Sequence, residues 1–286
     1  MNVRIIPRLD IKGPNLVKGI CFEGLRVLGK PEHFARSYYE SGADELVYLD
    51  AVASLYGRNN LLDIVERTAR KIFIPLTVGG GLRTVDDIRA VLRSGADKVS
   101  LNTAAIRRPE LIQEAARRFG SSTIVVSVEA IRKSDKSYEA YINYGRDCTG
   151  VDPFEWAVRA VELGAGELMV TSINNEGTGK GFDLELTRKI ADAVPVPVIA
   201  SGGAGNIHDV YGAINEGGAD AVCVASLLHY SRIKRCKDVE GDYSAEGNTV
   251  FLRQGGRVSG MGDVTISDIK QYFALQGISC RQIRLQ

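Results

Sequence analysis

The sequence has little of what disulfide frameworks, metal sites and membrane segments require. Its five cysteines form no Cys-x-x-Cys pair, and its three histidines are far apart, so neither a disulfide framework nor a metal centre is indicated. No apolar run approaches the roughly 18 residues that span a bilayer, and no signal core follows the first residues. We therefore expect a cytoplasmic protein that uses no metal or cofactor.

An excess of charge of either sign is also missing. The chain carries 36 basic and 35 acidic residues, a formal net charge of +1, so its overall charge favours neither nucleic acid nor a membrane surface as a partner. With 286 residues, 44% of them hydrophobic, it has ample material for the core of a globular domain.

The sequence does contain an internal repeat. Two glycine-rich segments, Val78–Gly81 and Ala200–Gly203, are each followed by a similar apolar segment, Asp97–Thr103 and Asp220–Ser226. Gly81 and Gly203 lie 122 residues apart, and Asp97 and Asp220 lie 123 apart. A period of that length is half a domain rather than one unit of a solenoid.

Short apolar runs alternate with amphipathic stretches along the chain, which is the pattern of repeated βα units in a parallel sheet. Helices are expected between the strands, as at 85–94 and 109–119. Two equivalent halves with eight strands predict a single domain over residues 1–286, a closed (β/α)8 TIM barrel with a twofold half-barrel repeat; the alternative is an open doubly wound sheet. The eight predicted strands are Arg4–Asp10, Glu45–Asp50, Ile74–Gly79, Lys98–Asn102, Thr123–Glu129, Glu167–Ile173, Val196–Ser201 and Ala221–Ser226.

Small and glycine residues follow the predicted strands in two groups, at the end of the barrel where such folds place their chemistry. Glycines let an anion approach backbone N–H groups, and a helix N-terminus adds further donors, so each group is a predicted phosphate site. A ligand with a phosphate at each end would fit both; the alternative is that the glycines only relieve crowding. The first group is Gly81, Asn102 and Thr103, and the second is Gly177, Gly202, Gly203, Ala225 and Ser226.

Two carboxylates are expected between these sites. Asp10 ends the first predicted strand and Glu129 ends the fifth, on the opposite wall of a barrel. If their environments separate their pKa values, one can accept a proton while the other donates one. The alternative is that they only pair with Lys12, Lys18 or Arg132.

Six motifs in order resemble the cyclase subunit of imidazole glycerol phosphate synthase: Leu9–Lys12, Leu16–Gly19, Asp44–Val47, Thr77–Gly81, Val99–Ala105 and Ile199–Gly205. The resemblance covers nearly all of residues 2–230 and resumes near 266–276. It implies an ammonia-dependent lyase of histidine biosynthesis. That enzyme converts a bis-phosphorylated ribulosyl-formimino-aminoimidazole-carboxamide nucleotide to imidazole glycerol phosphate and aminoimidazole carboxamide ribotide.

The resemblance implies roles for residues at the same end. Asp10 matches the family's general base, and Glu129 stands where the family has aspartate. The long segment 13–29 matches a lid that brings Lys18 to the substrate, and Asp50 is a further candidate for contact with substrate or lid.

Two more residues depart from the family's usual pattern. Asn174, also a candidate for contact with substrate or lid, replaces an aspartate near the second phosphate site, and Arg8 replaces a small residue and is expected to bring positive charge toward the barrel interior.

At the opposite end, four predicted strands begin with a charged residue. The resemblance implies that these residues form a salt-bridged gate, with Thr77 behind it, through which ammonia enters from a docked glutaminase. The alternative is a set of solvated surface ion pairs. The chain itself shows no Cys-His-Glu constellation, so the glutaminase is expected as a separate subunit in a heterodimer. The four gate candidates are Arg4, Glu45, Lys98 and Glu167.

Two other functions remain open at this stage. Paralogues of this subunit are thought to supply ammonia for amidination of an acetamido sugar in surface-polysaccharide pathways, although they commonly lack the aspartate that Asp10 represents. A non-catalytic phosphate-binding scaffold is the third possibility. Residues 231–262 lengthen the last βα connection as an insertion, for which a partner contact, a cover over the second phosphate site and a hairpin at 248–258 are alternatives.

Overall fold

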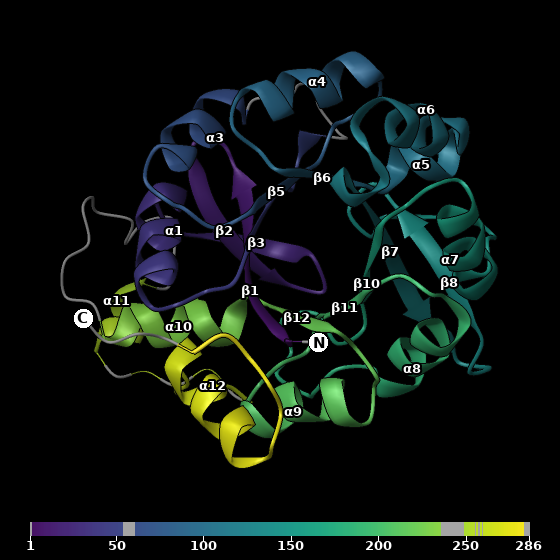
Figure 1. Cartoon of the computed structure of the whole chain (residues 1–286). Helices are drawn as coiled ribbons and strands as arrows, with labels where there is room; N and C mark the ends of the chain where they lie inside the picture. Colours follow the sequence, from purple (N-terminus) through teal and green to yellow (C-terminus); the bar gives the residue numbers. More distant parts are fainter. Residues whose placement is uncertain are drawn as a thin grey trace.

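A closed barrel of eight parallel strands forms the centre of the molecule (Figure 1). The computed structural model describes residues 2–53, 61–235, 249–254, 256, 258 and 260–282. Each barrel strand is parallel to the next, and β12 pairs with β1, which confirms the barrel and excludes the open sheet. The strands are β1 (Arg4–Lys12), β4 (Leu46–Asp50), β5 (Leu76–Gly79), β6 (Lys98–Leu101), β7 (Ile124–Arg132), β10 (Glu167–Ser172), β11 (Val198–Ser201) and β12 (Ala221–Val224).

Helices surround the barrel, as Figure 1 shows. They turn an apolar stripe toward the strands: in α4, for example, Ile88 and Val91 are buried, and Thr84 caps the helix by accepting a hydrogen bond from the backbone N–H of Asp87. The helices are α1 (Pro31–Glu40), α3 (Leu62–Ala69), α4 (Val85–Arg93), α5 (Thr103–Arg107), α6 (Glu110–Phe119), η1 (Ser121–Thr123), α7 (Pro153–Glu162), α8 (Leu184–Ala193), α9 (Ile207–Asn215), α10 (Ser226–Arg235), α11 (Thr249–Arg253) and α12 (Ile266–Leu275).

A recurring Gly-Ala-Asp sequence precedes three of the barrel strands and explains part of the repeat. In each copy the glycine has a positive φ, which lets the chain turn from a helix into the next strand. The aspartates Asp44, Asp97 and Asp220 then accept hydrogen bonds at 2.8 to 2.9 Å from the backbone N–H groups of Ile5, Leu76 and Val198 in the neighbouring strands. Each aspartate therefore fixes the start of one strand against the next.

The barrel has two apolar layers. The larger one fills the space between strands and helices, and the smaller one lies inside the barrel. Side chains alternate between these layers along each strand. The inner layer consists of Ile6, Val47, Leu49, Val125, Met169, Ile199, Ala221 and Cys223.

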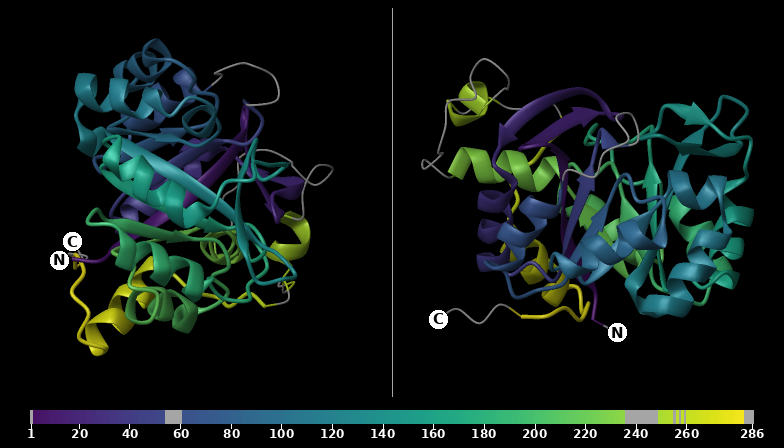
Figure 2. Two further views of the ribbon diagram at one scale, coloured as in Figure 1. Left: turned by 90° about the vertical axis from the view of Figure 1, so that its right-hand side faces the viewer. Right: turned by 90° about the horizontal axis from the view of Figure 1, so that it is seen from above.

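Two antiparallel additions extend from one end of the barrel. β2 (Asn15–Ile20) and β3 (Glu23–Gly29) form a hairpin after β1, and β8 (Tyr138–Ile142) and β9 (Asp147–Cys148) follow β7. Figure 2 shows the first hairpin over the end of the barrel opposite the start of β1. The predicted lid at 13–29 is thus a β-hairpin, with a turn at Cys21 and Phe22 in which both φ values are positive, as tight hairpins require.

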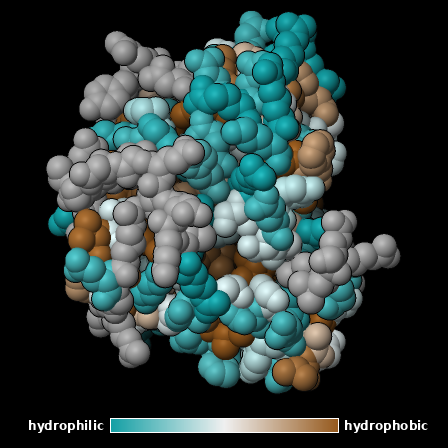
Figure 3. Space-filling view, turned by 90° about the vertical axis from the view of Figure 1, so that its left-hand side faces the viewer, coloured by the Kyte–Doolittle hydropathy of each residue, from teal (hydrophilic) through white to brown (hydrophobic). Residues whose placement is uncertain are grey.

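The described residues between β12 and α12 form two helices. α10 begins directly after β12 and carries Arg232, Lys234 and Arg235, and α11 lies within 248–258, so a hairpin there is wrong. Thr249 and Leu252 are buried three residues apart, which suits one face of a helix rather than alternating strand positions. Residues 236–248 of this segment lie outside the described part of the chain. Figure 3 shows the side of the molecule that carries α1 and α10, where hydrophobic side chains form only small separate groups.

Candidate active site

A cavity of about 270 Å³ opens at the end of the barrel where the strands finish, on the side of β4 to β7. The sequence placed Gly81, Asn102 and Thr103 in one group, and all three line this cavity together with Asp50 and Glu129. The cavity is large enough for a ligand with several functional groups.

A second, much smaller cavity lies on the opposite side of the same end. The structure brings together here all five residues of the second predicted group, Gly177, Gly202, Gly203, Ala225 and Ser226. Its volume is about 20 Å³, room for little more than one water-sized group.

Crowding explains part of the glycine pattern at this second cavity. A Cβ atom would lie 2.8 Å from the Ser172 carbonyl oxygen at Gly202, and 2.0 Å from the Gly181 carbonyl oxygen at Gly203. Both glycines have a positive φ as well. Crowding alone would thus require glycine at these two positions, while phosphate binding stays a prediction.

Asp10 lies between the two cavities and is fully buried. Its Oδ1 accepts a hydrogen bond from Arg8 Nε at 2.9 Å, and Lys18 Nζ lies 3.7 Å from its Oδ2. Burial acts to raise the pKa of this carboxyl, but the charges of Arg8 and Lys18 outweigh it, so the pKa of Asp10 is lowered. Asp10 is thus held as a carboxylate, and the expected pairing with Lys18 is present.

Glu129 faces the same space from β7 and has the opposite pKa shift. Burial raises its pKa to about 7; the nearby Asp10 charge acts in the same direction and Arg8 opposes it. Its Oε2 is buried without a hydrogen-bond partner among the residues that the structure describes. The two carboxyl groups therefore differ in protonation near neutral pH, Asp10 ionised and Glu129 partly protonated.

The hairpin of β2 and β3 closes over this space. Lys18 of β2 forms an ion pair with Glu176, and the backbone N–H of Cys21 donates to the Glu176 carbonyl oxygen at 2.8 Å. The Phe22 and Tyr144 rings lie with their centroids 4.2 Å apart. These contacts hold the hairpin against the residues that follow β10, and Lys18 lies next to Asp10.

The other two candidates for substrate contact have protein partners. Asp50 Oδ1 accepts a hydrogen bond from the Val52 backbone N–H at 3.0 Å, and burial raises the pKa of this carboxyl. Asn174 Oδ1 accepts from the Arg132 N–H at 2.7 Å, and its Nδ2 donates to the Arg132 carbonyl oxygen at 3.3 Å. Asn174 thus fixes the end of β7, and this second contact needs an amide donor that an aspartate would lack.

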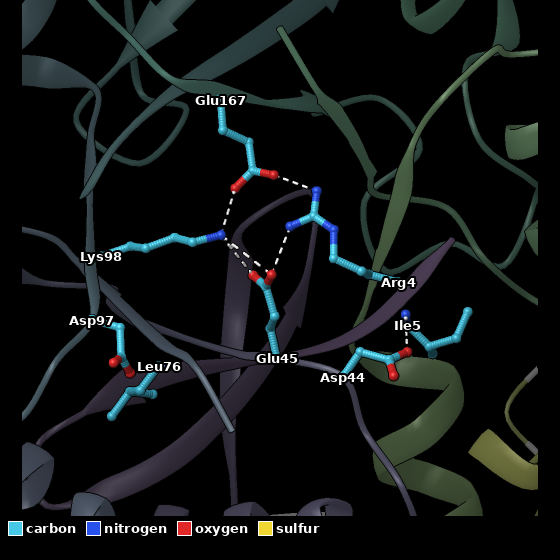
Figure 4. Close-up of polar contacts among 8 residues, drawn as sticks. All are labelled: Arg4, Ile5, Asp44, Glu45, Leu76, Asp97, Lys98 and Glu167. Carbon is cyan, nitrogen blue, oxygen red and sulfur yellow. Dashed lines mark hydrogen bonds and ion pairs between the residues drawn. The ribbon is translucent and has the colours of Figure 1, made fainter. Parts of the chain in front are cut away.

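The four charged residues at the strand starts form one ring at the opposite end of the barrel, shown in Figure 4. Arg4 donates to Glu45 at 2.7 Å and to Glu167, and Lys98 lies 3.1 Å from each of the same two carboxylates. The side chains of Glu45 and Glu167 are 8% and 6% exposed, so these are not solvated surface pairs. Burial alone would lower the pKa of Arg4, but Glu167 and Glu45 outweigh it and raise that pKa.

The barrel interior lies between this ring and the cavities. Thr77 is buried and pairs in register with Val47 and Lys98, so it lies on the inner face directly above the ring. Beyond it, Ser127 and Thr171 carry buried hydroxyl groups without a hydrogen-bond partner among the described residues. A small polar molecule passing along this axis would meet these hydroxyls.

Sequence reasoning missed several residues at the cavities. Arg83 and Arg107 line the first cavity, and Asn143 and Tyr144 enter it from the β8–β9 connection. A basic residue two places after Gly81 was a signal that could have been used. Tyr144 carried no comparable signal, because the chain must fold back before it reaches the cavity.

Comparison with known proteins agrees with this geometry. Residues 4–234 match the sequence family described as histidine biosynthesis protein. The chain belongs to this family. A subunit HisF of imidazole glycerol phosphate synthase from Legionella pneumophila is 56% identical over 208 residues, which cover 73% of this chain and 98% of that protein.

Other members of the histidine biosynthesis family give the same result. The HisF subunits from Alkaliphilus metalliredigens and Trichormus variabilis are 49% and 50% identical, over 80% and 82% of this chain and 91% and 92% of their own length. The family match ends within α10, so α11 and α12 lie outside it. Within the described residues, no helix is long and apolar enough to cross a membrane.

Proposed function

We propose that the chain is an ammonia-dependent lyase that converts the bis-phosphorylated ribulosyl-formimino nucleotide to imidazole glycerol phosphate and aminoimidazole carboxamide ribotide. The observation that carries this proposal is the pair of buried carboxyl groups, Asp10 and Glu129, whose pKa values are shifted in opposite directions at the end of the barrel that holds the two cavities. The relatives named above are subunits of imidazole glycerol phosphate synthase. A cytoplasmic location stays a prediction.

One carboxyl group is suited to accept a proton and the other to donate one. Asp10 is ionised and can accept a proton from the attacking amine as it adds to the substrate. Glu129, with a pKa of about 7, can hold a proton near neutral pH and give it to the leaving nitrogen. Asp10 is fully buried, whereas Glu129 lines the first cavity, where a substrate can reach it.

The ring of Arg4, Glu45, Lys98 and Glu167 supports a second subunit as the source of ammonia. Ammonia released into neutral water is mostly protonated and unreactive, whereas a route along the barrel axis would deliver it directly to the carboxylates. We place a glutaminase subunit at this end, in a heterodimer, with the ring as the gate and Thr77 behind it.

The direct test is turnover of the ribulosyl-formimino nucleotide by the purified chain with saturating ammonium salt at alkaline pH. We expect turnover by the wild type and a loss of about 10²-fold or more in Asp10→Asn, which keeps the shape but removes the base. Glu129→Asp is the matched control for the length of the acid side chain. It moves the carboxyl group, and a misplacement of about 1 Å can lower the rate ~10²-fold.

One observation favours a second candidate. Arg8, which replaces a small residue of the family, lines the second cavity, so the side chains that meet a ligand there differ from the family's usual ones. The alternative is amidination of an acetamido sugar with ammonia from the same route. Absence of turnover in the wild type and its appearance in Glu129→Asp would favour this second substrate. Absence of turnover in both proteins would contradict the cyclase proposal.

A further inference from the structure

Arg8 is an arginine inside the barrel whose hydrogen-bonding capacity is only partly used. Its side chain is 2% exposed and lies with its guanidinium carbon 5.1 Å from the centroid of the Phe22 ring. Nε donates to Asp10 at 2.9 Å and Nη1 to Ser201 Oγ at 3.4 Å. Nη2 is buried and has no hydrogen-bond partner among the described residues.

The pairing with Asp10 does not account for this free nitrogen. Nε alone makes that contact, whereas Nη2 remains a buried donor without an acceptor among the described residues, which is unfavourable for folding. Such a cost is tolerated in a native site when a ligand or water supplies the acceptor.

Arg8 lines the second cavity and faces other groups that suit an anion. Ser226 Oγ, in the same wall, is also buried without a partner, and α10 begins at Ser226, so the positive end of a ten-residue helix is directed there. The one carboxylate in this wall, Glu176, has its charge balanced by Lys18.

We propose that Arg8 determines specificity at the second cavity by donating from Nη2 to an oxygen of a phosphate monoester whose remaining oxygens lie at the cavity opening. The volume of about 20 Å³ admits one such oxygen and excludes a whole phosphate group. Gly202, Gly203 and Ser226 would surround the opening. This assignment rests on the proposed function only in taking the ligand to be phosphorylated.

The experiment measures inorganic phosphate binding site by site, through backbone amide NMR shifts of the full chain during titration. Gly202 and Gly203 report the second cavity, and Gly81 reports the first as an internal control. Because loss of Arg8 alone would leave the buried Asp10 charge uncompensated, the comparison is between Asp10→Asn and Arg8→Gln/Asp10→Asn. These two proteins differ only at Arg8.

We expect the Kd reported by Gly202 and Gly203 to rise by about 10- to 100-fold in the double variant, the range for loss of a charged hydrogen bond. The Kd reported by Gly81 should stay within about twofold, since Arg8 does not line the first cavity. An equal Kd at Gly202 and Gly203 in the two proteins would overturn the proposal, and so would a lack of any phosphate-dependent shift at these glycines in Asp10→Asn.

Arg8→Lys in the otherwise unchanged chain covers the case in which the double variant does not fold. It keeps the positive charge but loses the planar fork, so the Kd at the second cavity should still rise several-fold; an unchanged Kd would overturn the proposal. Phosphate binding needs no turnover. A chain without cyclase activity but with Arg8-dependent binding would refute the proposed reaction and leave this inference standing.

Discussion

Two charged clusters at opposite ends of β1 are built alike and behave differently. At one end, Arg4 and Lys98 face two glutamates, and every charged group has partners of opposite sign. At the other end, Arg8 and Lys18 face Asp10 and Glu176, yet Arg8 Nη2 and Asp10 Oδ2 have no hydrogen-bond partner among the described residues. Arg4 and Arg8 share the inward face of one strand, because side chains alternate along it.

The two clusters differ in burial and in the number of hydrogen-bonding atoms that have no partner. The Arg4 side chain is 21% exposed, whereas the Arg8 side chain is 2% exposed. A partly exposed ring in which every charge is paired costs less to disturb than a fully buried pair, which is compatible with the proposed gate. A buried cluster with unsatisfied groups is costly by itself and suits a site that a ligand completes.

The largest expected effect on stability is at the end of β1 that holds Arg8 and Asp10. Arg8→Gln removes one member of a buried pair and should lower the free energy of unfolding by about 3 kcal/mol or more, since Asp10 keeps only the more distant Lys18. Denaturant unfolding of Arg8→Gln and of Arg8→Gln/Asp10→Asn measures it. The double variant should recover most of the loss; equal destabilisation of both would mean that the pairing with Asp10 is not the cause.

The second expected effect is the pH dependence of stability from Glu129. Its pKa rises from 4.5 to about 7 on folding, so the folded state binds more protons between these values. The stabilising contribution of its protonated form is present below pH 4.5 and is lost as pH rises through 7, on the order of 3 kcal/mol in total. Unfolding titrations at pH 5 and pH 8 should show this loss in the wild type.

Glu129→Gln serves as the matched control for this titration. The amide cannot ionise, so the difference in stability between pH 5 and pH 8 should shrink by about the amount assigned to Glu129. An unchanged difference in the variant would assign the pH dependence to other groups and would contradict the raised pKa.

Much of the barrel could be predicted from the sequence because its pattern is local and repeated. All eight strands occur where the apolar runs are, with ends that differ by at most three residues. The two groups of glycine and small residues also line two separate cavities, as their positions after consecutive strands require.

The parts that the sequence did not predict depend on contacts between distant segments. The hydrogen bond between Arg8 and Asp10 joins residues two apart. Whether the two Nη atoms of Arg8 find acceptors depends on Ser201 and on the end of β12, which are distant in the sequence. The hairpin over the mouth was expected as a lid, yet its pairing through Glu176 was not, since that residue lies more than 150 positions from Lys18. The hydrogen bonds between the Asn174 side chain and the Arg132 backbone could not be predicted either, because the two residues are far apart in the sequence.

The smallest expected effect on stability is at the gate end. Arg4→Gln leaves Lys98 between Glu45 and Glu167, and the ring is partly exposed, so the free energy of unfolding should fall by only about 1 kcal/mol. Activity with ammonium salt should be unchanged, because added ammonia can reach the opposite end directly. In the proposed heterodimer, activity with glutamine and the glutaminase subunit should change several-fold, since the ring would then lie on the proposed ammonia route. Assays with the two nitrogen sources separate these cases, and an equal change with both would place Arg4 in the structure of the barrel rather than in ammonia transfer.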